Sequence, residues 1–222
     1  MGYFGSKATA GLCQALLAMQ PKHSVYIDSH LGGGCLMQRK AQSLRSIGID
    51  LDEQALKAFR CSYPVELVHG CAHEYLSSFD YQGDEYIFSD PPYIYSTRRS
   101  GRRYRYDYTD DDHHALLEIL KSVPCKVMVA GHPSKLYDTA LKGWQRVSFQ
   151  VTTQGVVRTE VVWFNYTLEH PHWSDYAGCN NIDRQRIRRK AELWAKRYRG
   201  LDAAERQALL NAMFAVEVET VL

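Results

Sequence analysis

With 222 residues, 45% of them hydrophobic and 23% charged, the chain can form one sizeable α/β core with an appendage, and a disordered protein is excluded. Lysine and arginine number 27 against 25 acidic residues, a net charge of only +2, so binding to nucleic acid would require local basic clusters. No apolar stretch approaches the roughly 18 residues that cross a bilayer, and there is no secretory signal pattern, so we expect a soluble cytoplasmic protein with no membrane partner.

Seven short runs rich in Val, Ile, Phe and Tyr are strand candidates. They cover residues 25–28, 46–51, 65–68, 85–88, 126–130, 146–151 and 160–166. Segments with helical spacing lie between the first five, such as 53–60 and 111–122, the latter with Thr109 or Asp110 as its N-cap. This alternation predicts a parallel sheet covered by helices, and the short connection 152–159, with Gly155, predicts an antiparallel hairpin at its end.

The residue pattern changes at about residue 183. From there on it predicts two helical segments, 183–199 and 202–218, which are joined at Gly200. Asp202 and Glu205 have the spacing of a capping box for the second segment. We predict an α/β domain at 1–170 and a basic helical extension at 171–222 packed on it. The last helix fits either the core or a dimer contact, so we expect a monomer or a weak dimer.

Cysteine and histidine give no metal pattern. The six cysteines are scattered without a CxxC pair, which argues against both a zinc site and a disulfide framework. His113 and His114 follow three acidic residues, but nothing nearby completes a set of metal ligands. We therefore expect no metal and two solvent-exposed histidines in the first turn of a helix.

The first predicted strand runs into Gly32-Gly33-Gly34, where the absence of Cβ atoms lets the backbone approach a ligand closely. The second ends at Asp50, about twenty residues further on, where an acid can accept hydrogen bonds from ribose hydroxyls. A tight turn with no ligand explains the glycines alone equally well, but both features together predict a nucleoside-type cofactor. The lack of a Walker lysine and of the full GxGxxG spacing disfavours nucleoside triphosphates and dinucleotides.

A further buried strand stops at Asp90-Pro91-Pro92-Tyr93. Two prolines fix φ and remove two backbone donors, which leaves carbonyl oxygens free as acceptors. The Asp90 carboxylate and the Pro91 carbonyl can accept both hydrogens of an adenine amino group, whose lone pair can then attack a methyl group on a sulfonium. The base has to be flipped out of a duplex, and Tyr93 is placed to stack on it. The alternative is a proline-stiffened loop after a core strand.

Together these motifs resemble those of the Dam-type family of DNA adenine-N6 methyltransferases, and more closely its short phage and prophage members, over most of the chain. Residues 2–7 resemble the N-terminal motif, 28–34 and Asp50 the cofactor motifs, 90–93 the catalytic motif, and 128–137 and 158–166 the downstream strand motifs. The cofactor-contacting residues that we assign by this resemblance are Tyr3, Gly5, Lys7, Asp28, His30, Gly32, Gly33, Gly34, Asp50 and Cys71. The catalytic residues would be Asp90, Pro91, Pro92 and Tyr93.

The resemblance implies a Rossmann-like S-adenosylmethionine-dependent methyltransferase fold: a mostly parallel seven-stranded sheet with a C-terminal antiparallel hairpin, plus C-terminal helices. S-adenosylmethionine would be the methyl donor and S-adenosylhomocysteine the product. Three departures stand out. Ser29 and His30 replace a Pro and a Phe, so we expect altered cofactor affinity; Cys71 replaces an acid; and the short distance from Cys71 to Asp90 leaves no room for a separate target-recognition insert.

Two basic clusters are candidates for holding nucleic acid. The first, at 96–106, interleaves arginines with aromatic residues, and the second lies on the helical segment 184–199. The nucleic-acid-binding residues that we predict are Arg98, Arg99, Arg102, Arg103, Arg105, Arg188 and Arg189. The alternatives are a solvated hairpin for the first cluster and a solvated helix face for the second.

The sequence thus predicts a DNA adenine-N6 methyltransferase that acts on an adenine flipped out of duplex DNA, in a bacterial, phage or mobile-element setting such as restriction-modification. The alternatives are an RNA adenine methyltransferase and a catalytically inactive DNA-binding relative.

Overall fold

The computed structural model describes residues 7, 12–98, 104–153, 156–168 and 181–221. The chain divides into two compact units, Met1–Tyr176 and Ala177–Leu222. In the described ranges, no helix combines the length and the apolar character that crossing a membrane requires.

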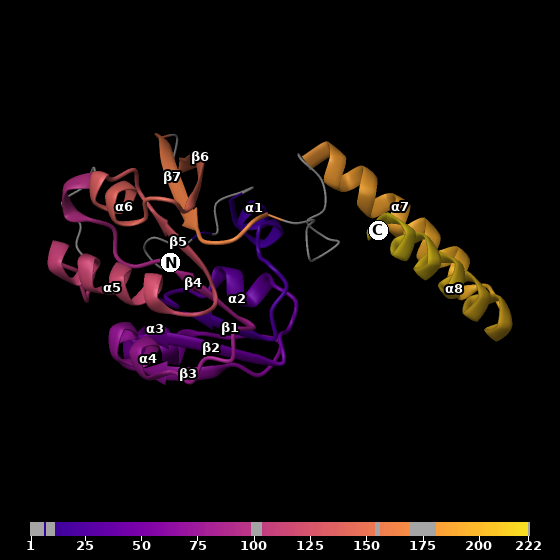
Figure 1. The fold of residues 1–222 in the computed structure, drawn as a ribbon, viewed down its shortest axis with the longest axis horizontal. Helices are drawn as coiled ribbons and strands as arrows, with labels where there is room; N and C mark the ends of the chain where they lie inside the picture. Colours follow the sequence, from indigo (N-terminus) through magenta and orange to yellow (C-terminus); the bar gives the residue numbers. More distant parts are fainter. Residues whose placement is uncertain (1–6, 8–11, 99–103, 154–155, 169–180, 222) are drawn as a thin grey trace. The chain divides into compact units, whose positions relative to one another are not determined.

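The first unit contains one seven-stranded sheet with the order β3-β2-β1-β4-β5-β7-β6 (Figure 1). The strands are β1 (Val25–Asp28), β2 (Arg45–Asp50), β3 (Glu66–His69), β4 (Glu85–Ser89), β5 (Lys126–Gly131), β6 (Gln145–Thr153) and β7 (Val156–Phe164). The first five are parallel, whereas β7 runs antiparallel to β5 and pairs with β6 as an antiparallel neighbour. The predicted mostly parallel sheet with a closing hairpin is therefore confirmed, and the strand order reverses between β1 and β4, where such sheets bind ligands.

The helices of this unit lie before and between the strands. They are α1 (Leu12–Ala18), α2 (Cys35–Arg39), α3 (Glu53–Ala58), α4 (Ala72–Ser78), the 3-10 turn η1 (Tyr95–Thr97), α5 (Asp110–Ser122) and α6 (Lys135–Ala140). The predicted helices at 53–60 and 111–122 correspond to α3 and α5. Thr109 caps α5 in a reciprocal capping box with Asp112, which confirms one of the two predicted caps.

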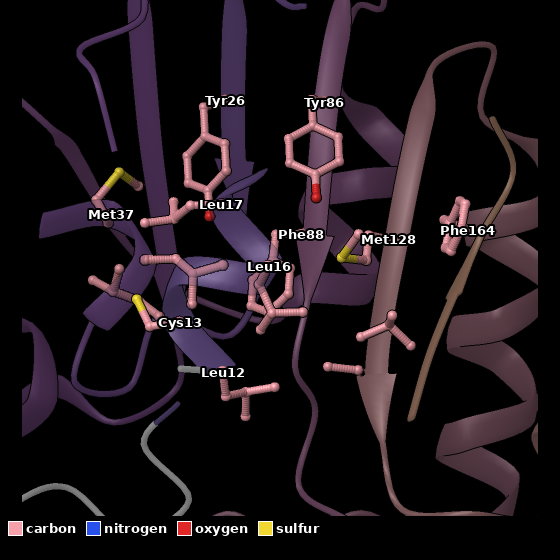
Figure 2. Close-up of a cluster of buried hydrophobic side chains, with 14 of the residues drawn as sticks. Leu12, Cys13, Leu16, Leu17, Tyr26, Met37, Tyr86, Phe88, Met128 and Phe164 are labelled. Carbon is pink, nitrogen blue, oxygen red and sulfur yellow. The ribbon is translucent and has the colours of Figure 1, made fainter. Parts of the chain in front are cut away.

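Two apolar layers cover the two faces of the sheet, because successive side chains along a strand point to opposite faces. Figure 2 shows one layer, in which Tyr26 and Tyr86 lie on neighbouring strands and Leu17 of α1 packs in the same cluster. Ile27 and Ile87 point the other way, into a layer that α4, α5 and α6 complete. Because helices cover both faces of the sheet, the carboxyl ends of β1, β2 and β4 are the part of these strands that remains uncovered.

His113 corrects one expectation. It is 0% exposed, and its Nδ1 lies 2.9 Å from the Tyr137 hydroxyl of α6. Its position in α5 shares a face with Leu116, Leu117 and Leu120, all of them buried, so the helix turns this histidine into the core.

The second unit consists of α7 (Asn181–Arg199) and α8 (Ala203–Val221) in its described part. The predicted capping box of α8 is present: the Asp202 carboxylate accepts from the Glu205 backbone N–H, and the Glu205 carboxylate accepts from that of Asp202, both at 2.9 Å. Arg206 donates to the Arg199 carbonyl at 2.8 Å across the connection between the two helices.

Candidate cofactor pocket and catalytic corner

The glycine turn after β1 depends on having no side chain at Gly34. This residue has φ +62°, and a Cβ atom there would lie 2.2 Å from the Phe59 ring and 3.2 Å from Leu31. Gly32 also has a positive φ, of 49°. Only glycine adopts this conformation at low cost, so the backbone can pass tightly between β1 and α2.

Asp50, the last residue of β2, holds the turn in place. Its Oδ2 accepts a hydrogen bond from the Gly32 backbone N–H at 2.6 Å, and its Oδ1 accepts from the Asp52 N–H at 2.7 Å. Burial raises the pKa of Asp50, while these two backbone donors lower it and so favour the ionised form. The acid that was predicted from its place after the second strand therefore faces the glycine turn.

Asp28, at the end of β1, is 3% exposed, and its Oδ1 has no hydrogen-bond partner in the described structure. Burial, with a smaller contribution from the nearby Asp90 charge, raises the pKa of Asp28 to about 8. A buried carboxyl oxygen without a partner is costly, so a bound group that donates a hydrogen bond here would be favoured.

These residues line one space, called the strand-end pocket below. It encloses about 840 Å³, part of it open to solvent, at the carboxyl ends of β1, β2 and β4. Its wall includes glycines 32–34 together with Asp28, Asp50, Asp90 and Pro92. The structure thus brings the glycine turn and the Asp90 corner, predicted from separate motifs, to one pocket.

Lys7 makes a direct ion pair with Asp90: its Nζ donates to Asp90 Oδ1 at 2.6 Å, and the lysine side chain is 4% exposed. The same Nζ also contacts the Tyr93 hydroxyl and lies 3.7 Å from Glu160 Oε2. Burial alone would lower the pKa of Lys7, but the charges of Asp90 and Glu160 keep it above its ordinary value. For Asp90, burial dominates and raises its pKa to about 6, although Lys7 opposes this rise.

Tyr93 is buried, and its hydroxyl donates to Glu160 Oε2 at 2.8 Å. Its ring lies against the His132 ring, with 4.1 Å between the centroids. Tyr93 is not among the described residues that line the strand-end pocket. The tyrosines that do so are Tyr104 and Tyr106, which belong to the predicted basic cluster at 96–106, and Tyr108, which follows it. Base stacking by Tyr93 remains a prediction.

Glu160 and His132 were not predicted as site residues. Glu160 comes from β7, and His132 follows β5; the Glu160 Oε1 and His132 Nε2 atoms are 3.7 Å apart. One signal was present in the sequence: Glu160 directly precedes the apolar run 161–164, and a charge buried beside such a run requires a partner.

His30 lines the pocket, as predicted for the residue that replaces a phenylalanine. Its Nδ1 lies 2.9 Å from the Ser29 hydroxyl, and its Nε2 lies 2.9 Å from the Tyr108 hydroxyl. Burial lowers the pKa of His30 to about 3, so its ring is neutral at physiological pH. The contacts with Ser29 and Tyr108 at its two ring nitrogens hold the ring in place.

Cys71 is half-buried at the N-terminus of α4, and its Sγ lies 3.5 Å from His73 Nδ1. The pocket wall includes its two chain neighbours, Gly70 and Ala72, and Cys71 is not among the described wall residues. A contact with the cofactor through this part of the chain would therefore involve the neighbours of Cys71, and its own role stays a prediction.

The predicted arginines have different surroundings. Arg98 has a side chain only 5% exposed, and it donates to the Tyr93 carbonyl at 2.6 Å and to the Asp107 carboxylate at 2.8 Å, so it ties the two ends of the loop together. Arg105 is half exposed and pairs with Asp52 at 2.6 Å beside the pocket.

On α7, the Arg188 guanidinium pairs with Glu192 at 3.1 Å, and both Arg188 and Arg189 are exposed. Five predicted site residues lie outside the described residues: Tyr3, Gly5, Arg99, Arg102 and Arg103.

The strand order, the glycine turn after β1 and the acid after β2 together decide the fold. The chain has the Rossmann-like fold of S-adenosylmethionine-dependent methyltransferases. Among the described residues, no group of three or more His, Cys, Asp or Glu side chains could hold a metal ion.

Similar solved structures include TrmN from Thermus thermophilus, which is 19% identical with a TM-score of 0.49, and the match covers 71% of this chain and 49% of that one. TrmK of M. capricolum, in complex with S-adenosylhomocysteine, is 8% identical with a TM-score of 0.47, covering 95% and 96% of the two chains. The 23S rRNA methyltransferase ErmE is 11% identical with a TM-score of 0.45, covering 78% and 70%.

No protein-family model matches the chain, and no curated protein matches it. The resemblance to the Dam-type family therefore remains a prediction. Because the similar structures have low sequence identities and TM-scores, the function has to be inferred from the residues of this chain.

Proposed function

We propose that this protein transfers a methyl group from S-adenosylmethionine to the exocyclic amine of an adenine in DNA. One observation carries the proposal: the Asp90 carboxylate and glycines 32–34 line the same pocket, so an acceptor for an amino group and a seat for a nucleoside-type donor share one space.

The pocket fits S-adenosylmethionine in three respects. Residues 32–34 let a ligand approach the backbone, because their turn carries no side chains. Asp50 still has lone pairs available for ribose hydroxyls beside its two backbone donors. The unpartnered Asp28 Oδ1 is suited to the ammonium group of the amino-acid part. When bound, S-adenosylmethionine supplies a methyl group on a positively charged sulfur.

Asp90 and Pro91 would then act on the amine. Lys7 occupies Asp90 Oδ1, which leaves Oδ2 to accept one amine hydrogen while the Pro91 carbonyl accepts the other. With a pKa of about 6, Asp90 is ionised at neutral pH and can also accept the proton that the amine loses. Lys7 and the Pro91-Pro92 pair fix the carboxylate and the carbonyl in place, so alignment and electrostatics supply the catalysis.

Substitution of Asp90 tests this proposal. Asp90→Ala should lower methyl transfer by about 10²–10³-fold or more, because it removes a group aimed at the reacting nitrogen. Binding of S-adenosylhomocysteine, measured by calorimetry, should persist. Asp80→Ala is the matched control, since Asp80 is an exposed acid that does not line the strand-end pocket. Normal turnover by Asp90→Ala would end the assignment.

Methylation of adenine in RNA is the second candidate. It is favoured by the short connection between β3 and β4, which holds only α4 among its regular elements and no separate recognition module. A labelled-methyl assay in which duplex DNA, single-stranded DNA and RNA compete would distinguish the substrates. If none is labelled and S-adenosylhomocysteine does not bind, the third reading, a DNA-binding relative without activity, is favoured.

A further inference from the structure

Two cysteines meet beside the strand-end pocket. Cys13 of α1 and Cys35 at the start of α2 have their sulfur atoms 3.4 Å apart, although 22 positions separate them in sequence. Both are free thiols. A disulfide needs a sulfur–sulfur distance of about 2.05 Å, so closing the bond requires a shift of little more than 1 Å between two neighbouring side chains.

The surroundings activate this pair as a nucleophile. The Arg39 guanidinium lies 2.7 Å from Cys35 Sγ. The hydrogen bond from Cys35 and, to a smaller extent, Arg39 together lower the pKa of Cys13 to about 7 against the opposing effect of burial, while the same hydrogen bond raises the pKa of Cys35. The two thiols therefore share a single negative charge near neutral pH, and the thiolate is the form that reacts.

Of the two cysteines, only Cys35 can be reached from the strand-end pocket. Cys13 is 1% exposed and packs with Leu12, Leu16 and Leu17 in the apolar layer that Figure 2 shows. Cys35 is half-buried and belongs to the wall of the strand-end pocket. A small reagent in that pocket would meet Cys35 first, with Cys13 directly behind it.

We propose that Cys13 and Cys35 form a dithiol modification site, which hydroperoxides entering through the strand-end pocket oxidise to a disulfide. The scattered cysteines predicted no disulfide framework, and the proposed bond is a reversible, redox-responsive modification of two free thiols.

The chemistry balances with the hydroperoxide as oxidant. The proton that Cys35 donates in the hydrogen bond passes to Cys13, which leaves the Cys35 sulfur as the thiolate beside the Arg39 guanidinium. This thiolate attacks the O–O bond, which breaks to give a Cys35 sulfenic acid and an alcohol, or water from hydrogen peroxide. The Cys13 sulfur, whose proton passes to the departing hydroxide, then attacks the Cys35 sulfur. Two thiols and one hydroperoxide thus give one disulfide, one alcohol and one water; the two sulfurs are oxidised and the peroxide oxygens are reduced.

Peptide mapping of the full chain tests the site. We expect equimolar hydrogen peroxide to produce a linked peptide pair containing Cys13 and Cys35, with the loss of two hydrogens. Oxidation of Cys35 should be faster than that of an isolated thiol, because the Arg39 guanidinium contacts its sulfur and Cys13 converts the sulfenic acid to the disulfide. Cys61, another half-buried free cysteine, is the internal reference for that rate.

Single variants supply the controls. Cys13→Ser should let the Cys35 sulfenic acid accumulate, where a sulfenic-acid probe traps it, and Cys61→Ser should leave the linked pair unchanged. The proposal is overturned if the wild-type protein gives no Cys13–Cys35 peptide, or if Cys61 is oxidised faster than Cys35.

A second experiment tests whether the hydroperoxide enters through the strand-end pocket. Only this experiment rests on the proposed function. S-adenosylhomocysteine at ten times its dissociation constant leaves about a tenth of the protein free, so oxidation of Cys35 should slow about tenfold. Oxidation that proceeds at the same rate with bound S-adenosylhomocysteine would refute entry through the pocket. If the ligand does not bind but the linked pair still forms, the cofactor assignment fails and the dithiol site stands.

Discussion

Replacing Lys7 by methionine should move the pH dependence of the enzyme toward alkaline pH. The proposed reaction needs ionised Asp90, whose pKa burial raises to about 6 and which the ion pair with Lys7 keeps from rising further. In the wild-type protein, kcat/KM should therefore fall as the pH drops through about 6, because this ratio reports the ionisations of the free enzyme.

The size of the shift follows from the contact. An opposite charge within hydrogen-bond distance lowers a carboxyl pKa by about 1–3 units, so without Lys7 the pKa of Asp90 should rise to about 7–9. At pH 7 the ionised fraction of Asp90 would fall from about nine-tenths to about one-tenth for a pKa of 8, which is nearly a tenfold loss of activity. The loss should be recovered at higher pH.

The assay is kcat/KM for labelled-methyl transfer between pH 5 and pH 9, at saturating cofactor. Glu160→Gln is the matched variant, because the Glu160 charge raises the pKa of Asp90 and its removal should move the acid limb below pH 6. Folding of both variants is checked by circular dichroism across the same range, since removing one partner from a buried ion pair costs about 3–5 kcal/mol.

Opposite shifts for the two variants are the signature of electrostatic control of Asp90. A uniform loss of activity at every pH, with the acid limb unmoved in both variants, would refute this reasoning and assign Lys7 to packing or to ligand contact.

Three other predictions concern stability and binding. Gly34→Ala should lower the free energy of unfolding in urea by about 2–5 kcal/mol, from about 1–2 for the left-handed backbone and about 1–3 for overpacking against Phe59. In a Phe59→Ala background only the backbone cost should remain, so equal costs in both backgrounds would contradict the clash. Arg98→Ala should destabilise the protein by about 1–3 kcal/mol, because the partly exposed Asp107 carboxylate and the Tyr93 carbonyl lose a hydrogen-bond donor, without changing the salt dependence of nucleic-acid binding; a flatter slope would mean that Arg98 contacts phosphate. Asp202→Ala should remove the cap of α8 at a cost of about 1 kcal/mol, seen as reduced helicity on heating; an unchanged melting profile would show that the cap contributes nothing.

Much of the fold was predictable because buried parallel strands are continuous apolar runs. Residues 25–28 were predicted with the observed bounds, and most other strands within one or two residues. The short helices α2 and α4 gave no usable signal, since five to seven residues contain too few helical repeats for a periodic pattern. Their existence depends on the strands that they connect.

The site was predictable where one local motif carries it. Asp50, Asp90 and the glycines follow directly from strands, so their arrival at one edge of the sheet follows from the parallel topology. The surroundings of Arg98 did not follow, because its partner Asp107 lies across the loop and no local pattern marks that pairing.

The prediction that His113 is exposed to solvent was wrong. Its spacing to Leu116 and Leu120 places all three residues on one buried face of the helix. Glu160 contacts Tyr93 only because β7 pairs with β5 in the folded sheet. This contact depends on the tertiary structure, so no local sequence pattern predicts it.

The hydrogen bonds of Asp50 affect how any mutation there should be interpreted. Its carboxylate already supports the backbone of the Gly32 bend and the entry to α3, so a truncated side chain would release both segments before any ligand arrives. Weaker binding by an Asp50 variant would therefore report the loss of a ribose contact together with a disturbed pocket wall. Even Asp50→Asn does not separate the two effects, because it replaces one of the two acceptor oxygens by an NH2 donor.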